Sequence, residues 1–543
     1  MQKNKNILIA VAITTMFSFS FFYAVQPQQV ADTVTVDSSN GSNNEALARP
    51  STKPQSPQKS LNLPSAKEFP SKKEPLRQNK QAKHLVQKND ESRSSNKVYV
   101  ALNSPNDNRY NSKPFNTINA PAAWDQTTGS RDVTVAVLDS GFALDHEDLT
   151  GQWSFNPGEV GGGKESDGID NDGNGYVDDF RGWDFSTADN TPQSGTVNPV
   201  GQGVTHGTEV SGLIGATGNN AIGSTGVAWN TTLLPLQVLS DDGSGYGNDI
   251  VDAIYYAVDQ GVDVINMSLG TSGDDPSVRV AVDYAISQNV VVVAAAGNCG
   301  NNLDGVCVGQ SPGYVTFPAS YNKVIAVGAV DDMSRRAGFS SYGQRVDIVA
   351  PGSGTMVAPT WSPVNQTSAY ENSLYGTSFS SPIVAGSAAL LRSIGPFRPD
   401  EIKALLLASS RKTNISNGIY SPEYGHGVMD IGRSVSIAEA LQAQPLVQPP
   451  ELVSAGDIRP EHDAITANLT SVGCLAEIDT WCTILLQNNV PGYDRYLPYQ
   501  KTKISGLADW TWSGGLLTNG TWQITARQGS SYSSSAYFEV GSR

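Results

Sequence analysis

From residue 132 to residue 441, short apolar runs alternate with stretches whose apolar positions have helical spacing. Continuous apolar runs of this length are typical of strands that a parallel sheet buries on both faces. The runs are Val133–Asp139, Leu233–Leu239, Val262–Met267, Val290–Ala295 and Val324–Val330. Helical stretches lie between them at 248–260 and 277–288. The alternation predicts an α/β fold of three layers, in which helices cover both faces of a parallel sheet.

The first 25 residues have a different pattern. Lys3 and Lys5 precede an uncharged apolar stretch that runs from Ile7 to Val25, as in an export signal. The stretch is nearly long enough to remain as a membrane anchor. We favour a signal peptide at 1–25 that is cleaved, because Ser and Thr dilute its hydrophobicity, and we then expect no stable membrane association.

Three further segments lie outside the main domain. Residues 26–96 are rich in Ser, Asn, Gln, Lys and Pro, which predicts a disordered pro-segment or linker. A proline-rich linker is expected at 442–455. Residues 456–543, rich in Thr, Ser, Trp and Tyr, predict a small β-sandwich-like domain. That domain has three open roles, namely substrate binding, surface attachment or removal during maturation. The main domain is then 97–441.

Charge and cysteine content restrict the partners and the cellular compartment to be expected. The net charge is −16, and residues 99–543 hold 22 Lys or Arg against 45 Asp or Glu. Such an acidic body argues against nucleic-acid partners and suits solubility outside the cell. The four cysteines form two close pairs, Cys299 with Cys307 and Cys474 with Cys482. In an exported chain we expect two local disulfides, the alternative being four buried thiols.

Three separated segments carry the candidate chemistry. Asp139 ends the first apolar run, His206 opens His-Gly-Thr, and Ser378 lies in Gly-Thr-Ser-Phe-Ser-Ser-Pro. A serine hydroxyl is a poor nucleophile until a base takes its proton, and the base needs a carboxylate that fixes its tautomer. Taken singly, each residue is more often a cap or a structural residue. Together they predict a catalytic triad at the carboxyl edge of the sheet.

These motifs, with Val262–Gly270 and Val291–Asn298, resemble the subtilisin-like serine proteases (the subtilase family) over about residues 100–441. Ile118–Trp124 is similar to the thermitase-like branch. The resemblance implies that Ser378 attacks the scissile carbonyl, His206 is the general base and Asp139 orients it. It also implies that Asn298 donates to the oxyanion together with the Ser378 backbone N–H.

The resemblance also implies how substrate binds. Two segments match those that pair with an extended peptide as added strands, which gives affinity with little sequence preference. They are Ser244, Gly245, Tyr246 and Gly247, and Ser268, Leu269 and Gly270. Ala295, Ala296 and Gly297 are expected to line a roomy apolar pocket, which a Cys299–Cys307 bridge would narrow. We therefore expect broad specificity that favours large apolar or aromatic residues before the cut.

Calcium is the expected cofactor, in a structural role. An acidic insertion follows the start of an EF-hand loop, although Arg181 stands where the final bidentate Glu belongs. Its candidate ligands are Asp167, Asp170, Asp172, Asn174, Tyr176, Asp178 and Asp179. The alternative is a solvated acidic loop, but carboxylates this close repel one another without a cation. By resemblance, Asp148, Asn220 and Ile222 match the family's high-affinity calcium site.

Two residues depart from the family pattern. Glu209 stands where the family has a second His, and Phe379 replaces the Met that usually follows the nucleophile. Because Phe379 removes an oxidisable thioether beside the serine, we expect activity that survives peroxide.

Three functions compete at this point. The first is a secreted (extracellular or periplasmic), monomeric, calcium-stabilised serine endopeptidase that acts on proteins or peptides. The second is a non-catalytic subtilase-like binding domain, which the presence of all four site residues disfavours. The third is another serine hydrolase such as an esterase. It is weakened because Phe379 and Ser380 follow Ser378, without the glycine of a Gly-x-Ser-x-Gly elbow.

Overall fold

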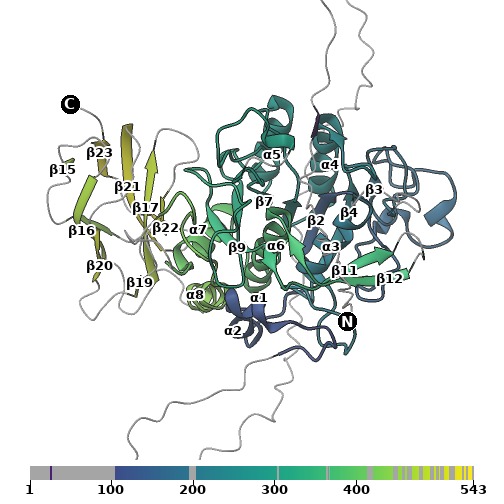
Figure 1. The fold of residues 1–543 in the computed structure, drawn as a ribbon, viewed down its shortest axis with the longest axis horizontal. Helices are drawn as coiled ribbons and strands as arrows, with labels where there is room; N and C mark the ends of the chain where they lie inside the picture. The colour runs from purple at the N-terminus through teal and green to yellow at the C-terminus, as the bar shows by residue number, and fades with distance from the viewer. Residues whose placement is uncertain are drawn as a thin grey trace, which may run out of the picture. The chain divides into compact units, whose positions relative to one another are not determined.

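The computed structural model describes residues 104–194, 203–301, 305–362, 365, 367–412 and 420–443 (Figure 1). It also gives the strand β1 at Val25–Gln26 and a set of strands from Glu451 onward. Apart from Val25 and Gln26 of β1, the predicted signal peptide 1–25 and the predicted pro-segment 26–96 lie outside these residues. Within the described part of the chain, no helix combines the length and apolarity that crossing a membrane requires.

A seven-stranded sheet forms the centre of the main domain. Its strand order is β3-β4-β2-β6-β7-β8-β9, and every neighbouring pair is parallel. The strands are β2 (Thr134–Asp139), β3 (Trp183–Asp184), β4 (Thr232–Gln237), β6 (Val264–Met267), β7 (Val291–Ala295), β8 (Ile325–Val330) and β9 (Ile348–Pro351). All five predicted strands are present, which confirms the parallel α/β fold.

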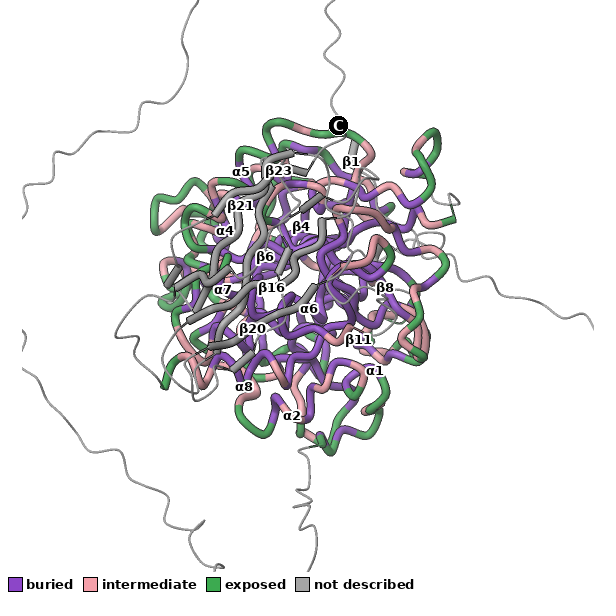
Figure 2. The backbone as a smooth tube through the Cα atoms, turned by 90° about the vertical axis from the view of Figure 1, so that its left-hand side faces the viewer, coloured by how far each residue is buried: buried purple, intermediate pink, exposed green. Residues whose placement is uncertain are grey.

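Alternate side chains of the sheet belong to two separate cores. Val135 and Val137 of β2 join one core, whereas Ala136 and Leu138 join the other. The first core is completed by α1 (Ser112–Thr117), α2 (Ala120–Trp124), α3 (Gly203–Gly215), α6 (Thr377–Ile394), α7 (Pro399–Ser409) and α8 (Ile431–Ala443). The second is completed by α4 (Gly247–Asp259) and α5 (Pro276–Ser287). Because helices complete the core on each side, both faces of the sheet are covered, as predicted. Figure 2 shows that the buried residues lie at the centre and the exposed residues at the periphery.

Several short elements lie outside the central sheet. A hairpin of β11 (Ala358–Ser362) and β12 (Thr367–Glu371) packs on α3. The hairpin approaches α3 closely at Gly212, which has no Cβ. A Cβ at this position would lie only 2.2 Å from Pro359 Cδ. The other pairs are β10 (Ser353–Gly354) with β13 (Leu374–Tyr375), and β1 with β5 (Gly245–Tyr246). Three 3-10 turns lie at Pro157–Glu159, Lys164–Ser166 and Gly305–Cys307.

The C-terminal segment contains strands, as its composition predicted. They form two antiparallel sheets. The strands are β14 (Glu451–Ser454), β15 (Arg459–Pro460), β16 (Ala467–Leu475), β17 (Trp481–Asn488), β18 (Arg495–Tyr496), β19 (Gln500–Lys501), β20 (Leu507–Trp512), β21 (Gly520–Gln528), β22 (Ser531–Tyr532) and β23 (Ala536–Val540). β14 lies inside the range assigned to the linker, where it pairs with β16.

One of the two predicted disulfides is present among the described side chains. Cys299 and Cys307 are bonded, with their Cα atoms 5.2 Å apart. The side chains of Cys474 and Cys482 lie outside the described residues, so their pairing remains a prediction.

Candidate active site

Asp139 and His206 meet at the carboxyl edge of the sheet. Asp139 is the last residue of β2 and is fully buried. His206 Nδ1 lies 2.7 Å from Asp139 Oδ1, and the Ser140 N–H donates to the same oxygen at 2.7 Å. Two donors on one oxygen fix the direction of the carboxylate, which in turn fixes the imidazole tautomer with its proton on Nδ1.

The electrostatics of His206 favour its protonated form. Burial by itself opposes the charged ring, but the charge and hydrogen bond of Asp139, and then the charge of Glu209, outweigh it. The pKa of His206 is therefore raised above its ordinary value. A raised pKa makes the imidazole a stronger base toward a nearby hydroxyl.

The start of α6 carries Ser378, and the next residue, Phe379, contacts the His206 ring. Ser378 is the second residue of that helix, after Gly376, whose φ of 152° few side-chain-bearing residues adopt. The Phe379 ring lies with its centroid 5.4 Å from that of His206. Ser378 Oγ donates to the Ser268 carbonyl at 3.2 Å. The structure thus brings the three predicted triad residues to one edge of the sheet.

Pro382 lies beyond the first turn of α6. Because α6 begins at Thr377, Pro382 is inside the helix and cannot donate to the Ser378 carbonyl four residues earlier. The Ser268 hydroxyl donates to that carbonyl instead, at 2.8 Å. Asn266 Nδ2 donates to Ser268 Oγ at 3.0 Å, and Ser381 Oγ donates to Asn266 Oδ1 at 2.7 Å. This buried chain of hydrogen bonds fixes the backbone of Ser378.

Asn298 lies at the same edge, three residues beyond β7. Its Oδ1 accepts from Thr377 N at 3.0 Å and from Thr377 Oγ1 at 3.1 Å. With Oδ1 held by the first residue of α6, the donor that Asn298 offers is its Nδ2. An amide donor and the Ser378 backbone N–H can together stabilise an oxyanion.

The predicted substrate-binding residues lie in two environments. Gly245 and Tyr246 form the short strand β5, where the Tyr246 side chain is exposed. Ser244 directly precedes β5, Gly247 begins α4, and the remaining predicted residues lie at the ends of β6 and β7. Sequence reasoning missed Thr316, which is fully buried and would lie 2.8 Å from a Cβ placed on Gly297. A branched side chain with a hydroxyl therefore borders the expected pocket, and only tertiary contact reveals it.

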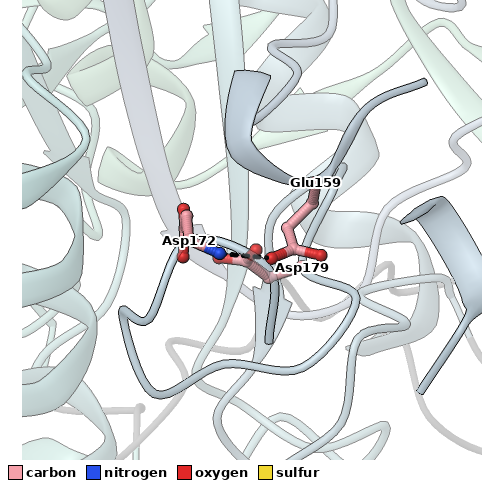
Figure 3. Close-up of side chains that lie close together, drawn as sticks. All are labelled: Glu159, Asp172 and Asp179. Atoms are coloured by element: carbon pink, nitrogen blue, oxygen red, sulfur yellow. Dashed lines mark hydrogen bonds between the residues drawn. The ribbon is translucent and has the colours of Figure 1, made fainter. Parts of the chain in front are cut away.

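In the acidic insertion, three carboxylates converge. Glu159, Asp172 and Asp179 each place an oxygen within 4.8 Å of the others, and Glu159 and Asp179 are fully buried (Figure 3). The Asp172 N–H donates to Glu159 Oε1 at 3.2 Å. Glu159 precedes the predicted loop and was not among its candidate ligands. This set of hard oxygen donors fits a divalent cation such as calcium.

The other predicted ligands of the insertion make different contacts, and two of them, Asp170 and Asp178, accept hydrogen bonds from the loop's own backbone. Asp170 accepts from the N–H groups of Gly173, Asn174 and Gly175. Asp178 accepts from Gly168 N. Asn174 Nδ2 donates to Asp179 Oδ2 at 2.9 Å. Asp167 and Tyr176 do not belong to the three-carboxylate cluster. Asp167 accepts from Asn171, and Tyr176 packs edge-on against Tyr256.

The residues predicted to form the second metal site lie around Asp148. Asn220 Nδ2 donates to Asp148 Oδ1 at 3.0 Å, and Ile222 N donates to Asn220 Oδ1 at 2.8 Å. Burial raises the pKa of Asp148 to about 6, against the lowering effect of its hydrogen bonds to Asn220 and Ser224. Asp107, which the sequence reasoning did not assign, accepts from the Asn219 and Asn220 N–H groups. Asp107 and Asp148 are both buried and both accept from the loop at 219–224, so their oxygens also fit a cation.

The fold and the site define an α/β protein with an Asp-His-Ser constellation at its strand ends. Residues 130–427 match the model of the Subtilase family, Peptidase_S8. The chain belongs to the subtilase family.

Three curated relatives illustrate the similarity. The chain is 37% identical to thermitase from Thermoactinomyces vulgaris over 54% of its length and 86% of the relative's. It is 35% identical to halolysin from Haloferax mediterranei over 68% of its length and 62% of that protein's. It is 33% identical to the halolysin-like extracellular serine protease Nep from Natrialba magadii, over 68% and 60%. The chain thus spans about three fifths of the two halolysin-type relatives.

The geometry of Asn298 predicts a selective loss of turnover. Asn298→Ala should lower kcat by about 10²–10³ and leave KM nearly unchanged, as expected for an amide that acts on an oxyanion rather than on bound substrate. This magnitude is that of the oxyanion asparagine of subtilisin itself. Steady-state kinetics on a peptide anilide measure both constants. Asn372→Ala, at an exposed position, is the matched control. A variant that raises only KM would assign Asn298 to substrate binding.

The contact of Phe379 with His206 predicts resistance to peroxide. Wild-type activity should survive mild hydrogen peroxide, whereas Phe379→Met should lose activity as its thioether becomes a polar sulfoxide beside the imidazole. Residual activity against time, with intact mass to count added oxygens, gives the comparison. Rapid loss in the wild type, at the same rate as in Phe379→Met, would contradict the prediction.

Proposed function

We propose that this protein is a secreted serine endopeptidase, stabilised by calcium, that hydrolyses protein or peptide substrates through an acyl-enzyme on Ser378. The observation that carries the proposal is the 2.7 Å contact between Asp139 and His206, with Ser378 on the adjoining helix start. The relative Nep, named as an extracellular serine protease, supports both the activity and the export. A location outside the cell or in the periplasm also suits the Cys299–Cys307 disulfide.

The proposed mechanism assigns each proton. His206 Nε2 takes the hydroxyl proton as Ser378 Oγ attacks the scissile carbonyl, and Asp139 stabilises the imidazolium. Asn298 Nδ2 and the Ser378 N–H donate to the resulting oxyanion. When the C–N bond breaks, His206 returns the proton to the leaving amine, and an acyl-enzyme remains. Water then attacks the ester with His206 again as base, which releases the acid and restores the serine.

Substrate recognition follows from the elements around the triad. β5 and the Ser268–Gly270 segment would add an extended peptide as a strand, so backbone hydrogen bonds would supply most of the affinity. The pocket beside Ala295, Ala296 and Gly297 would accept the side chain before the cut. We propose broad specificity with a preference for large apolar residues there, within the space that Thr316 leaves.

Calcium would act on stability rather than on chemistry. Glu159, Asp172 and Asp179 would hold one ion, and Asp148 with Asn220 would hold another. The argument is electrostatic, since several carboxylates that are buried close together repel one another unless a cation neutralises them. A bound ion would fix the insertion that leads from Asp139 toward His206.

Casein hydrolysis tests the proposed activity. Wild type should release soluble peptides, and Ser378→Ala should lose more than about 10³-fold of the rate. A fluorophosphonate probe should label the wild type but not Ser378→Ala, and Ser287→Ala, at an exposed serine, should behave as wild type. Hydrolysis of simple esters without casein cleavage would favour the esterase alternative. Casein binding without any hydrolysis would favour the binding domain.

Calcium removal tests the structural role. In the Ser378→Ala background, which prevents self-digestion, a chelator should lower the thermal midpoint by several degrees, because an ion at about 100 times its Kd contributes roughly 2.7 kcal/mol. Glu159→Gln and Asp179→Asn should each reduce this difference. Asp283→Asn, at an exposed carboxylate, should leave it unchanged. A midpoint that the chelator does not move in any variant would contradict both calcium positions.

A further inference from the structure

Glu209 is a buried carboxylate on the helix that carries His206. It follows His206 by three residues in α3, so the two side chains lie about one helical turn apart. Glu209 is 8% exposed. Its Oε1 accepts from Thr360 Oγ1 at 2.8 Å, across the contact between α3 and the hairpin strand β11. No Lys or Arg forms an ion pair with Glu209 among the described residues.

We propose that Glu209, held by Thr360, is an electrostatic positioning residue for His206, whose charge favours the imidazolium and thereby sets the pH below which turnover fails. The inference rests on the proposed function, because it concerns the general base of that reaction. It assigns Glu209 no contact with substrate. It also gives the β11–β12 hairpin a part in the chemistry, through the hydroxyl of Thr360.

The charges around this pair are few. On α3 the titratable residues are His206 and Glu209, and on β2 Asp139 faces the imidazole. On the hairpin, Glu371 adds negative charge near Glu209, while Tyr370 stays neutral because burial raises its pKa. Residues 377–387, the first three turns of α6, have no titratable side chain. The negative charge that acts on His206 therefore comes from Asp139 first and Glu209 second.

The ionisation of Glu209 is suited to such a role. Burial raises the pKa of Glu209 to about 7, while its hydrogen bond to Thr360 and the charge of His206 act in the opposite direction. The carboxylate thus gains its charge near neutral pH. Above that pH it stabilises the imidazolium, and so it raises the pKa of the general base. Removing the charge lowers that pKa, which makes the free base available at lower pH.

The pH profile of kcat/KM tests the proposal. Glu209→Gln keeps an oxygen acceptor for Thr360 and removes only the charge, so the acid limb should move to lower pH by about one unit. Thr360→Val should move it part of the way, because loss of the hydroxyl favours the neutral carboxyl, and Thr360→Ser should restore the wild-type limb. In Glu209→Gln, adding Thr360→Val should produce no further movement. Glu371→Gln should leave the limb in place or move it to higher pH.

A second measurement does not depend on catalysis. The chain has five histidines, so NMR of histidine-labelled protein in the Ser378→Ala background can follow the ring of His206, assigned by its loss in His206→Gln. The pKa of His206 should fall by about one unit in Glu209→Gln. If Glu209→Gln does not fold, Thr360→Val and Thr360→Ser carry the same test.

The outcomes separate the two proposals. An acid limb and a His206 titration that are both unchanged in Glu209→Gln would overturn the positioning role. A lower His206 pKa in a protein whose wild type cleaves no peptide bond would support the coupling and reject the endopeptidase. A loss of kcat/KM that is equal at every pH would mean that Glu209 only supports the fold, and would also overturn the inference.

Discussion

The site depends on the common direction of the strands in the central sheet. Because β2, β6 and β7 are parallel neighbours, their carboxyl ends meet at one edge. Asp139 ends β2, Ser268 follows β6, and Asn298 follows β7, so polar groups from distant parts of the chain become neighbours there. The strands are buried on both faces, and a shift of register by one residue would exchange the two cores. The packing of apolar side chains thus determines where these polar groups lie.

A gap in helical hydrogen bonding then fixes the backbone of Ser378, the proposed nucleophile. Pro382 has no N–H for the Ser378 carbonyl, and a buried carbonyl without a donor costs about 1–3 kcal/mol. Ser268 supplies the missing donor from the end of β6. Asn266 and Ser381 complete the chain of bonds, so α6 is tied to the sheet at the residue that must not move. Because Pro382 leaves the Ser378 carbonyl without its helical donor, that carbonyl binds the Ser268 hydroxyl at the end of β6. A residue with an N–H in place of Pro382 would not require this contact.

Much of this arrangement could be predicted from local sequence. The apolar runs gave the strands to within about two residues, and the position of Asp139 at a strand end followed from them. Glu159 could not be predicted, because it reaches Asp172 and Asp179 only through the folded course of the insertion. Thr316 borders Gly297 for a similar reason, since β7 and the segment after it come together only in the tertiary structure. Sequence pattern reports local periodicity, whereas these contacts depend on long-range packing.

The β11–β12 hairpin connects features that are otherwise separate. Its Thr360 donates to Glu209 on the His206 helix. Its Tyr370 donates to Glu147 at 2.9 Å, in the segment that carries Asp148, and the Ala369 carbonyl lies 3.0 Å from His146 Nε2. One short hairpin therefore contacts both α3, which carries His206, and the segment at 146–148. A change that loosens the segment at 146–148 would act on the hairpin through the bonds to Tyr370 and Ala369, and on α3 through the bond between Thr360 and Glu209. These contacts form a physical route from the segment that carries Asp148 to the helix that carries His206.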